Sequence, residues 1–524
     1  MTLLSLLKTV SKILLFICLF FIYCFSESLD CCKLHSQIDP KCFNIKIPPE
    51  DPFFIKVNKT VTCLNFVRST PVCQRSTRQQ LNKLTAFIDG STVYGSSKEH
   101  ESQLRTFDGG QLVINIITKQ PPTMEQLNLR PNQKLVRPET QEHFVAGDER
   151  VNEHPFLTAM HTIFLKEHNR IAKELRSHLP HFLRYIPSNI DLDDLFYQET
   201  RRIVVAEIQN IVYGEYLPSI LGEKFMNKYS LIVTETSDYD PDVNPTIFNE
   251  FTTAAFRFGH SMINSKFMVG SSQKRPVWWK LRDIFDGQKV RGNKMPIEQM
   301  LEGLISQAPQ KCDAYFSSEV IDHLFQKNNE RQDFGLDLLA INIQRGRDHG
   351  IPSYNSFRKH CGLKPLTSWS EKPSELDEAI WLNLKKVYEK VEDIDLYIGG
   401  VSERNVYQGS VGPVFACIIG EQFRRLKYGD RYFYSNSNKN GGKGLGEIAR
   451  KYVTKRRLGD LICDNTNLKG TQRWVTNQPN DNNNPFEYCS EKSSLNLAEI
   501  AKEISSELND PSVVSFCQDI GCDQ

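Results

Sequence analysis

Hydrophobic and polar residues alternate along most of the chain with the period of a helix. In LTAMHTIFLKEHNRIAKELRSHL, which begins at Leu157, apolar side chains recur every three or four residues and form one face. The same pattern recurs in ETRRIVVAEIQNIVYGEYL, PTIFNEFTTAAFRFGHSMI, DLLAINIQRGRDHG and GPVFACIIGEQFRRL. Strand-like alternation is scarce and brief, and neither an internal repeat nor a long linker occurs. The pattern predicts a mainly α fold, a single large helical domain with little β structure.

The N-terminal region has a different pattern. Lys8 and Lys12 precede the apolar run ILLFICLFFIYCF, which ends at Phe25 beside small residues. A charged start, a short apolar run and a small-residue end are typical of a secretory signal peptide. A signal anchor is the alternative, although the run is shorter than the roughly 20 residues that span a bilayer. We therefore expect three parts: a signal peptide at 1–26, the helical domain at 27–508 and a C-terminal tail at 509–524.

Composition supports secretion and excludes some partners. The 64 basic and 63 acidic residues give a net charge of +1, which offers no electrostatic argument for nucleic acid or for an anionic membrane. Two of the 14 cysteines lie in the apolar run, which leaves 12, an even number that suggests disulfides in a secreted protein. The sequon Asn58-Lys59-Thr60 fits the same location. We expect no nucleic-acid partner, and no membrane association after signal cleavage.

Two motifs place polar residues within apolar helical patterns. In FRFGH, a His260 among apolar residues is more often a hydrogen-bonded core residue than a ligand. However, Gly259 would let a flat group approach the backbone, and a neutral imidazole is a good axial ligand for haem iron. In NIQRGRDHG, Asn342 lies among apolar neighbours, so it needs a buried partner. One candidate partner is the Nδ1–H of a metal-bound His.

Two polar stretches carry further candidate chemistry. In LTAFIDGSTVYGSS, oxygen atoms recur at every second position: the side chains of Thr85, Asp89 and Ser91, and the Phe87 carbonyl between them. Such a loop can surround calcium, which takes six to eight oxygens, but an ordinary turn around Asp-Gly is an equal alternative. In AGDERVNEHP, at 146–155, three carboxylates, an Arg and a His gather in ten residues. This stretch is either a solvated surface loop or part of a reactive site.

Taken together and in this order, these motifs resemble those of the animal-type haem peroxidases. The resemblance runs from about Leu29 to Ala501 and includes GPVFACIIGEQFRRLKYGDRYFY and ICDNT near the C-terminus. It implies a secreted enzyme that uses hydrogen peroxide to oxidise phenolic, tyrosyl or halide donors at haem b. It also implies calcium as a second cofactor, and it makes extracellular matrix proteins candidate partners.

The resemblance assigns roles to single residues. His260 corresponds to the proximal iron ligand, Asn342 to the residue that accepts its Nδ1–H, and Arg257 to a residue near a haem propionate. Arg150 corresponds to the distal catalytic Arg, whose charge stabilises the negative charge that develops as the peroxide bond breaks. Glu153 corresponds to the Glu that forms an ester with a haem methyl group.

The resemblance also implies metal ligands and disulfides. The calcium ligands correspond to Thr85, Phe87, Asp89 and Ser91. Cys361–Cys417 and Cys463–Cys489 correspond to C-terminal disulfides of the family, and Cys63–Cys73 is a plausible local pair. His154 stands where some members have a Met that bonds a haem vinyl group, so that bond is not expected.

One family motif is missing. The distal catalytic His lies in a stretch that resembles WGQFxDHD, upstream of LDCC, whereas here the apolar run leads through SES directly to Leu29 and no Asp-His-Asp occurs. We expect peroxidase activity to be impaired, by about 10²–10⁴-fold for a lost general acid–base group; His154 is a weak candidate for a substitute base. Three alternatives stay open: an incomplete sequence, a haem-binding variant with little activity, and a non-enzymatic extracellular adhesion or matrix protein. The intact proximal motifs disfavour the third.

Overall fold

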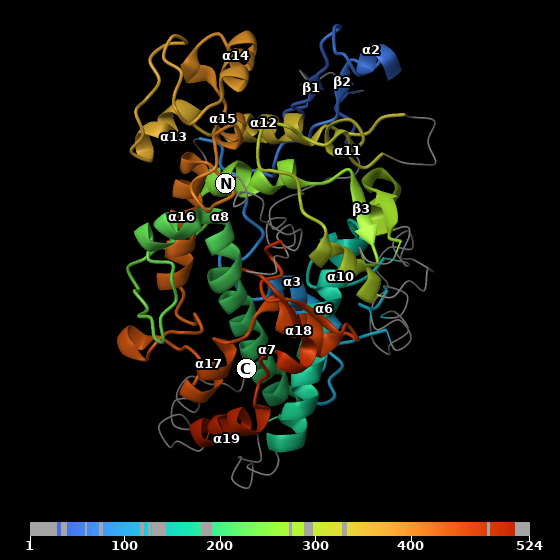
Figure 1. Cartoon of the computed structure of the whole chain (residues 1–524), viewed down its shortest axis with the longest axis vertical. Coiled ribbons are helices and arrows are strands. Elements are labelled where there is room, and N and C mark those ends of the chain that lie inside the picture. Colours follow the sequence, from blue (N-terminus) through green and yellow to red (C-terminus); the bar gives the residue numbers. More distant parts are fainter. Residues whose placement is uncertain are drawn as a thin grey trace.

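In a computed structural model of the chain, the structure describes residues 29–32, 39–57, 60–72, 77–115, 120–123, 127, 143–179, 191–271, 275–287, 297–326, 333–478 and 483–508. Helices make up most of the regular structure there, and each strand is only two to four residues long (Figure 1). The predicted mainly α fold with little β structure is confirmed. The predicted signal peptide, the Asn58 sequon and the C-terminal tail lie outside the described residues. Among the helices that the structure describes, none is long and apolar enough to cross a bilayer.

The elements are distributed over the whole described chain. The helices of the first half are α2 (Phe54–Val57), α3 (Ser91–Tyr94), α4 (Lys98–Leu104), α6 (Pro155–His178), α7 (Leu192–Ile211), α8 (Leu217–Lys228), α9 (Asn249–Thr253) and α10 (Ile297–Ser306). Those of the second half are α11 (Ser318–Ile321), α12 (Leu338–Asp348), α13 (Tyr354–His360), α14 (Glu378–Val387), α15 (Leu396–Val401), α16 (Pro413–Tyr428), α17 (Glu447–Val453), α18 (Leu458–Asn465) and α19 (Leu497–Leu508). Three antiparallel pairs of strands complete the fold: β1 (Ile45–Lys46) with β2 (Cys63–Leu64), β3 (Lys266–Val269) with β4 (Val277–Lys280), and β5 (Gly470–Gln472) with β6 (Phe486–Tyr488).

Helix α6 packs against several other helices of the core. It begins where the His154 side chain accepts a hydrogen bond from the Leu157 backbone N–H (3.4 Å), and Pro155 occupies the first turn, where its missing N–H has no partner to lose. The apolar face predicted from the sequence is buried against α7, α10, α18 and α19. Through this buried face, α6 joins helices from both halves of the chain into one core.

Helix α7 continues into α8 through a π-helical turn at Val212–Tyr216. Gly222 breaks the regularity of α8, with φ of 66°. A Cβ at this position would lie 2.2 Å from the Tyr407 carbonyl oxygen, so only Gly allows the turn around Tyr407 to approach the helix backbone. The isolated bridge between Leu221 and Gly409 fixes this approach. The turn is thereby anchored on the core helices.

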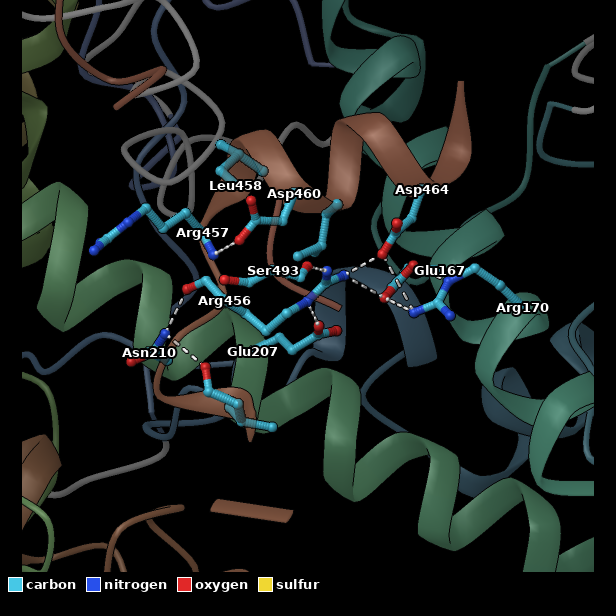
Figure 2. A network of polar contacts seen from close by, with 12 residues as sticks. Glu167, Arg170, Glu207, Asn210, Arg456, Arg457, Leu458, Asp460, Asp464 and Ser493 are labelled. Carbon is cyan, nitrogen blue, oxygen red and sulfur yellow. Dashed lines mark hydrogen bonds and ion pairs between the residues drawn. The ribbon is translucent and has the colours of Figure 1, made fainter. Parts of the chain in front are cut away.

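A buried ionic network joins three parts of the helical core (Figure 2). Arg456, which is only 1% exposed, donates to Glu207 on α7 (2.8 Å) and to Glu167 on α6 (3.1 Å). It also donates to Asp464 on α18 (2.7 Å), and Arg170 pairs with Glu167 (2.6 Å). Because these three carboxylates face two guanidinium groups, one negative charge is in excess. Burial and the neighbouring Glu167 raise the pKa of Glu207 to about 8. Glu207 is therefore the carboxyl group of this network that carries a proton at neutral pH.

Among the described residues, four disulfides are present, two within the N-terminal segment and two in the second half of the chain. Cys361–Cys417 and Cys463–Cys489 are present, as the family resemblance implies. The expected Cys63–Cys73 pair is wrong, because Cys63 bonds to Cys32, and Cys31 bonds to Cys42. The reason is topological: β2 pairs with β1, which brings Cys63 to the segment that follows the N-terminal cysteines rather than to its own neighbour in sequence.

Candidate active site

The segment that carries His260 is a 3-10 helix. The sequence pattern predicted a continuous helix here, but α9 ends at Thr253, Ala254 leaves the helical conformation with φ −135° and ψ −72°, and the chain continues as η5 (Ala255–Met262). Every residue of η5 is buried, so no solvent-facing stripe imposes the α-helical period. A 3-10 helix has three residues per turn and its i and i+3 side chains eclipse, so Arg257 and His260 lie on the same face.

Arg257 and His260 both contact Asn342 on α12. Asn342 Nδ2 lies 2.8 Å from His260 Nδ1, and Arg257 Nη1 donates to Asn342 Oδ1 at 3.0 Å. A guanidinium has only donors, so it takes the oxygen end of the amide and turns the nitrogen end toward the imidazole. The structure therefore brings together the predicted pair of His260 and Asn342, with the amide nitrogen rather than the expected acceptor oxygen facing the ring.

The second nitrogen of His260 fits a metal ligand. His260 is 2% exposed, and its Nε2 has no hydrogen-bond partner among the described residues. A buried polar atom without a partner is unfavourable unless something else satisfies it. Burial and the charge of Arg257 lower the pKa of His260 to about 3, so the ring stays neutral, the form that binds iron. An imidazole whose Nε2 has no protein partner can take an axial haem iron at that atom when Nδ1, rather than Nε2, carries the ring proton.

The distal candidate Arg150 lies on a second 3-10 helix, η2 (Glu149–Asn152). Asp148 caps this helix by accepting the Arg150 backbone N–H (2.9 Å), and the Arg150 side chain returns to the same carboxylate through Nε (2.7 Å) and Nη2. Burial acts to raise the pKa of Asp148, but Arg150 outweighs it and holds that pKa below its ordinary value. The guanidinium is thus fixed in place by a residue two positions before it. Sequence reasoning counted Asp148 among the carboxylates of this stretch but gave it no role.

Glu153 directly follows η2 and is held near Arg150 by the chain itself. Burial raises the pKa of Glu153 to about 7, and Asp148 acts in the same direction, whereas Arg150 opposes them. Its backbone carbonyl accepts the Asp286 N–H (2.8 Å), which fixes the end of the segment. At neutral pH a carboxyl group with this pKa exists in both protonation states, so it can be either a proton donor or a nucleophile.

Arg150 and Arg257 line one cleft of about 580 Å³, which is in the range of ligand sites. The distal and proximal segments therefore meet there. Arg345 on α12 and His349, which directly follows α12, line the same cleft, and the sequence analysis gave neither residue a role. His349 is held between Ser69 Oγ and Asn249 Oδ1, both at 2.7 Å. The signal that could have revealed these residues is the helix period, since positions 342, 345 and 349 share one face of α12.

All four predicted calcium ligands line a second, smaller cavity of about 90 Å³, together with Met160, Phe256 and Phe423. Gly147 and Asp148 line both cavities. A Cβ on Gly147 would lie 2.2 Å from the Ser91 carbonyl oxygen, so the distal segment packs directly on the predicted calcium loop. The loop and the distal Arg are thus parts of one structural unit.

Within the loop, two predicted ligands hold the backbone. Thr85 Oγ1 accepts the Phe87 N–H (3.1 Å), and Asp89 Oδ1 accepts the Ser91 N–H (3.0 Å). In the part of the chain that the structure describes, no group of three or more His, Cys, Asp or Glu side chains gathers in the manner of a metal site. The predicted set has a single carboxylate, Asp89, and otherwise hydroxyl and carbonyl oxygens.

His154 is a core residue. Its ring packs against those of Phe156 and Phe267, with centroid separations of 6.2 Å and 5.6 Å, and its side chain caps α6. It does not line the cleft that contains Arg150. The geometry therefore gives no support to His154 as a substitute base.

Comparison with known proteins identifies the family. The family described as animal haem peroxidase matches residues 22–476. The chain is 34% identical to peroxidasin homolog pxn-2 of Caenorhabditis elegans over 498 residues, which covers 90% of this chain and 36% of that protein. It is 38% identical to the chorion peroxidase of Drosophila melanogaster over 437 residues, which covers 81% of this chain and 51% of that protein.

Among solved structures, peroxidase A from Dictyostelium discoideum superposes with a TM-score of 0.72 at 28% identity, covering 91% of this chain and 89% of the other. A helical fold of this kind, with Arg150 and Arg257 lining one cleft and the neutral, buried His260 one 3-10 turn beyond Arg257, is that of a haem peroxidase domain. The chain belongs to the animal haem peroxidase family. It spans only about a third to a half of the length of the two relatives described above.

Proposed function

We propose that this protein binds haem b through His260 and uses hydrogen peroxide to oxidise small phenolic, tyrosyl or halide donors. The observation that carries the proposal is the His260 ring, held at Nδ1 by Asn342 while its buried Nε2 has no partner among the described residues. Membership of the family supports the same conclusion. Haem, when bound, supplies an iron that can be oxidised by peroxide, chemistry that side chains cannot provide.

The side chains of the protein itself would hold the haem ligand in position and stabilise the charge that develops on the peroxide. Asn342 holds the imidazole in one orientation, and Arg257 holds Asn342. Arg150, fixed by Asp148, supplies positive charge in the cleft where negative charge develops as peroxide is cleaved. Glu153, with a pKa of about 7, is the group that we propose for a covalent ester to haem. Calcium in the Thr85–Ser91 loop would stiffen the unit on which Arg150 rests.

Catalytic turnover is proposed to be low. The sequence contains no Asp-His-Asp, and the His154 ring lies in the aromatic core, so neither supplies a distal base. The alternative is an extracellular haem-binding or matrix protein with little or no peroxidase activity. Both forms are proposed to be secreted, on the evidence of the N-terminal apolar run and the four disulfides. The enzyme and the alternative are both proposed to bind haem, and they differ in the rate of peroxidase turnover.

The test is a haem titration followed by the Soret band. The purified chain is expected to bind one haem, and His260→Ala is expected to lose the axial-ligand signature while His360→Ala, at an exposed position on α13, keeps it. A normal Soret band in His260→Ala would overturn the assignment. Guaiacol oxidation by the haem-loaded protein then distinguishes the two forms: turnover faster than that of free haem supports the enzyme, and turnover no faster than that of free haem supports the alternative.

A further inference from the structure

An exposed tyrosine lies on a segment that runs along the His260 helix. Tyr315 is 62% exposed, and it belongs to residues 308–317, which follow α10. Three hydrogen bonds tie this segment to η5 and its C-terminal flank: Gln310 N–H to Met262 O (3.0 Å), Asn264 Nδ2 to Ala308 O (2.8 Å) and Cys312 Sγ to Phe258 O (3.7 Å). The segment that carries Tyr315 is therefore hydrogen-bonded to η5, the helix that carries His260.

A chain of contacts leads inward from Tyr315. The next residue, Phe316, packs against the ring of Tyr397 with a centroid separation of 6.4 Å, within the range of interacting aromatic pairs. Tyr397 is 2% exposed, and its hydroxyl donates to the Arg257 carbonyl at 3.2 Å. Burial raises the pKa of Tyr397, and a hydrogen bond with the Asn342 side chain acts against this rise. Asn342 in turn contacts His260, so each step from the imidazole to Phe316 is a direct contact, and Phe316 is the covalent neighbour of Tyr315.

We propose that Tyr315 is a second oxidation site, at the surface, for tyrosyl side chains of proteins that are too large to enter the cleft. The proposal rests on the proposed function, because peroxide is its oxidant. The substrate would meet the exposed phenol of Tyr315 instead of the cofactor. Small donors would continue to use the cleft lined by Arg150 and Arg257.

The chemistry balances without any further reactant. Tyr315 loses one electron, which passes by way of Phe316 and Tyr397 toward the His260 side of the site, and its phenolic proton goes to water. The Tyr315 radical then recovers one electron and one proton from a substrate phenol. Two substrate radicals join by a carbon–carbon bond between their rings. Peroxide accepts the two electrons and two protons in total and becomes two water molecules.

Exposure alone would select a different residue. Tyr407 is 79% exposed, more than Tyr315, but it lies on the turn anchored at Gly222 and makes no aromatic contact with other described residues. It is therefore a control for accessibility: a more exposed phenol without a chain of contacts to His260. If oxidation simply followed solvent access, Tyr407 would be modified first.

The experiment uses the haem-loaded protein, peroxide and a nitroso spin trap, with adducts located by peptide mass spectrometry. The adduct is expected on Tyr315 in the wild type and in Tyr407→Phe, to vanish in Tyr315→Phe, and to fall severalfold in Phe316→Leu, which keeps the exposed phenol but breaks the aromatic contact. A random copolymer of Glu and Tyr serves as the bulky donor. Tyr315→Phe is expected to oxidise it severalfold more slowly and to oxidise guaiacol at the wild-type rate.

The outcomes separate this inference from the proposed function. Wild-type protein that oxidises guaiacol, together with adducts on Tyr407 or unchanged copolymer oxidation by Tyr315→Phe, would overturn the surface site alone. Wild-type protein that binds haem but oxidises neither donor would overturn both. Loss of copolymer oxidation with retained guaiacol oxidation supports the surface site.

Discussion

The Asn342 side chain has a donor nitrogen and an acceptor oxygen, and its two neighbours differ in which of these atoms they can bind. Arg257 can only donate, so it takes the amide oxygen and leaves the nitrogen for His260. A neutral His that binds iron through Nε2 carries its proton on Nδ1, and this proton is best met by an acceptor. Substitutions at position 342 therefore test whether the side chain there donates to His260 Nδ1 or accepts from it.

Asn342→Asp is expected to strengthen the bond between His260 and iron. A carboxylate accepts from both Arg257 and the Nδ1–H of His260, which makes the ring more electron-rich, so the iron–histidine stretching frequency of the ferrous protein should rise. Asn342→Leu removes the partner and should weaken haem binding by about 10–100-fold, the usual cost of losing such a residue. Resonance Raman spectra and haem titrations measure the two effects. Asn383→Leu, on the exposed face of α14, should change neither; equal spectra for Asn342→Asp and wild type would contradict the argument.

Helices α6, α7 and α18 depend on a single buried cation. Arg456→Met removes the charged partner of Glu207 and one of the two charged partners of Glu167, and both of these side chains are fully buried. Breaking a buried ion pair in this way costs about 3–5 kcal/mol of unfolding free energy. Urea unfolding with the disulfides intact measures the loss. Arg404→Met breaks an exposed pair with Asp377 and should cost less than about 1 kcal/mol; equal losses would show that burial of the network contributes nothing.

The same network should make stability depend on pH. Burial raises the pKa of Glu207 from 4.5 in the unfolded chain to about 8 in the folded protein. Between these values the folded state holds a proton that the unfolded state has released, so the unfolding free energy falls as pH rises, by up to about 1.4 kcal/mol per pH unit. Glu207→Gln removes this titration, and its unfolding free energy should vary less between pH 5 and about 8. An identical pH profile in Glu207→Gln would assign the extra proton to another group.

At the scale of the molecule, calcium is expected to stabilise the whole fold, because the predicted loop packs on the distal segment through Gly147. Binding to the folded state alone adds about 2.7 kcal/mol when calcium is at 100 times its Kd. The midpoint of thermal unfolding should therefore rise with calcium and fall with a chelator. Asp89→Asn should abolish the rise, and Asp242→Asn, at an exposed position, should keep it. A rise that survives in Asp89→Asn would place calcium elsewhere.

The helical architecture could be predicted because a helix with one solvent-exposed face, such as α6, has an amphipathic sequence pattern. The break between α9 and η5 could not, since a segment buried on all sides has no polar stripe from which to read its period. The disulfide partner of Cys63 depends on the pairing of β1 with β2, and strands of only two residues have too little sequence pattern to predict that pairing. His260 and Asn342 were identified from motifs, whereas Asp148 and Tyr397 act through contacts that only the folded chain creates.

The 3-10 geometry of η5 has a consequence for how this segment can evolve. With three residues per turn, each added or deleted residue rotates everything beyond it by about 120°. An insertion between Arg257 and His260 would turn one of them away from Asn342, whatever its chemical nature. The spacing of these two residues is thus a constraint on length and not only on identity, and substitutions should be tolerated here where insertions and deletions are not.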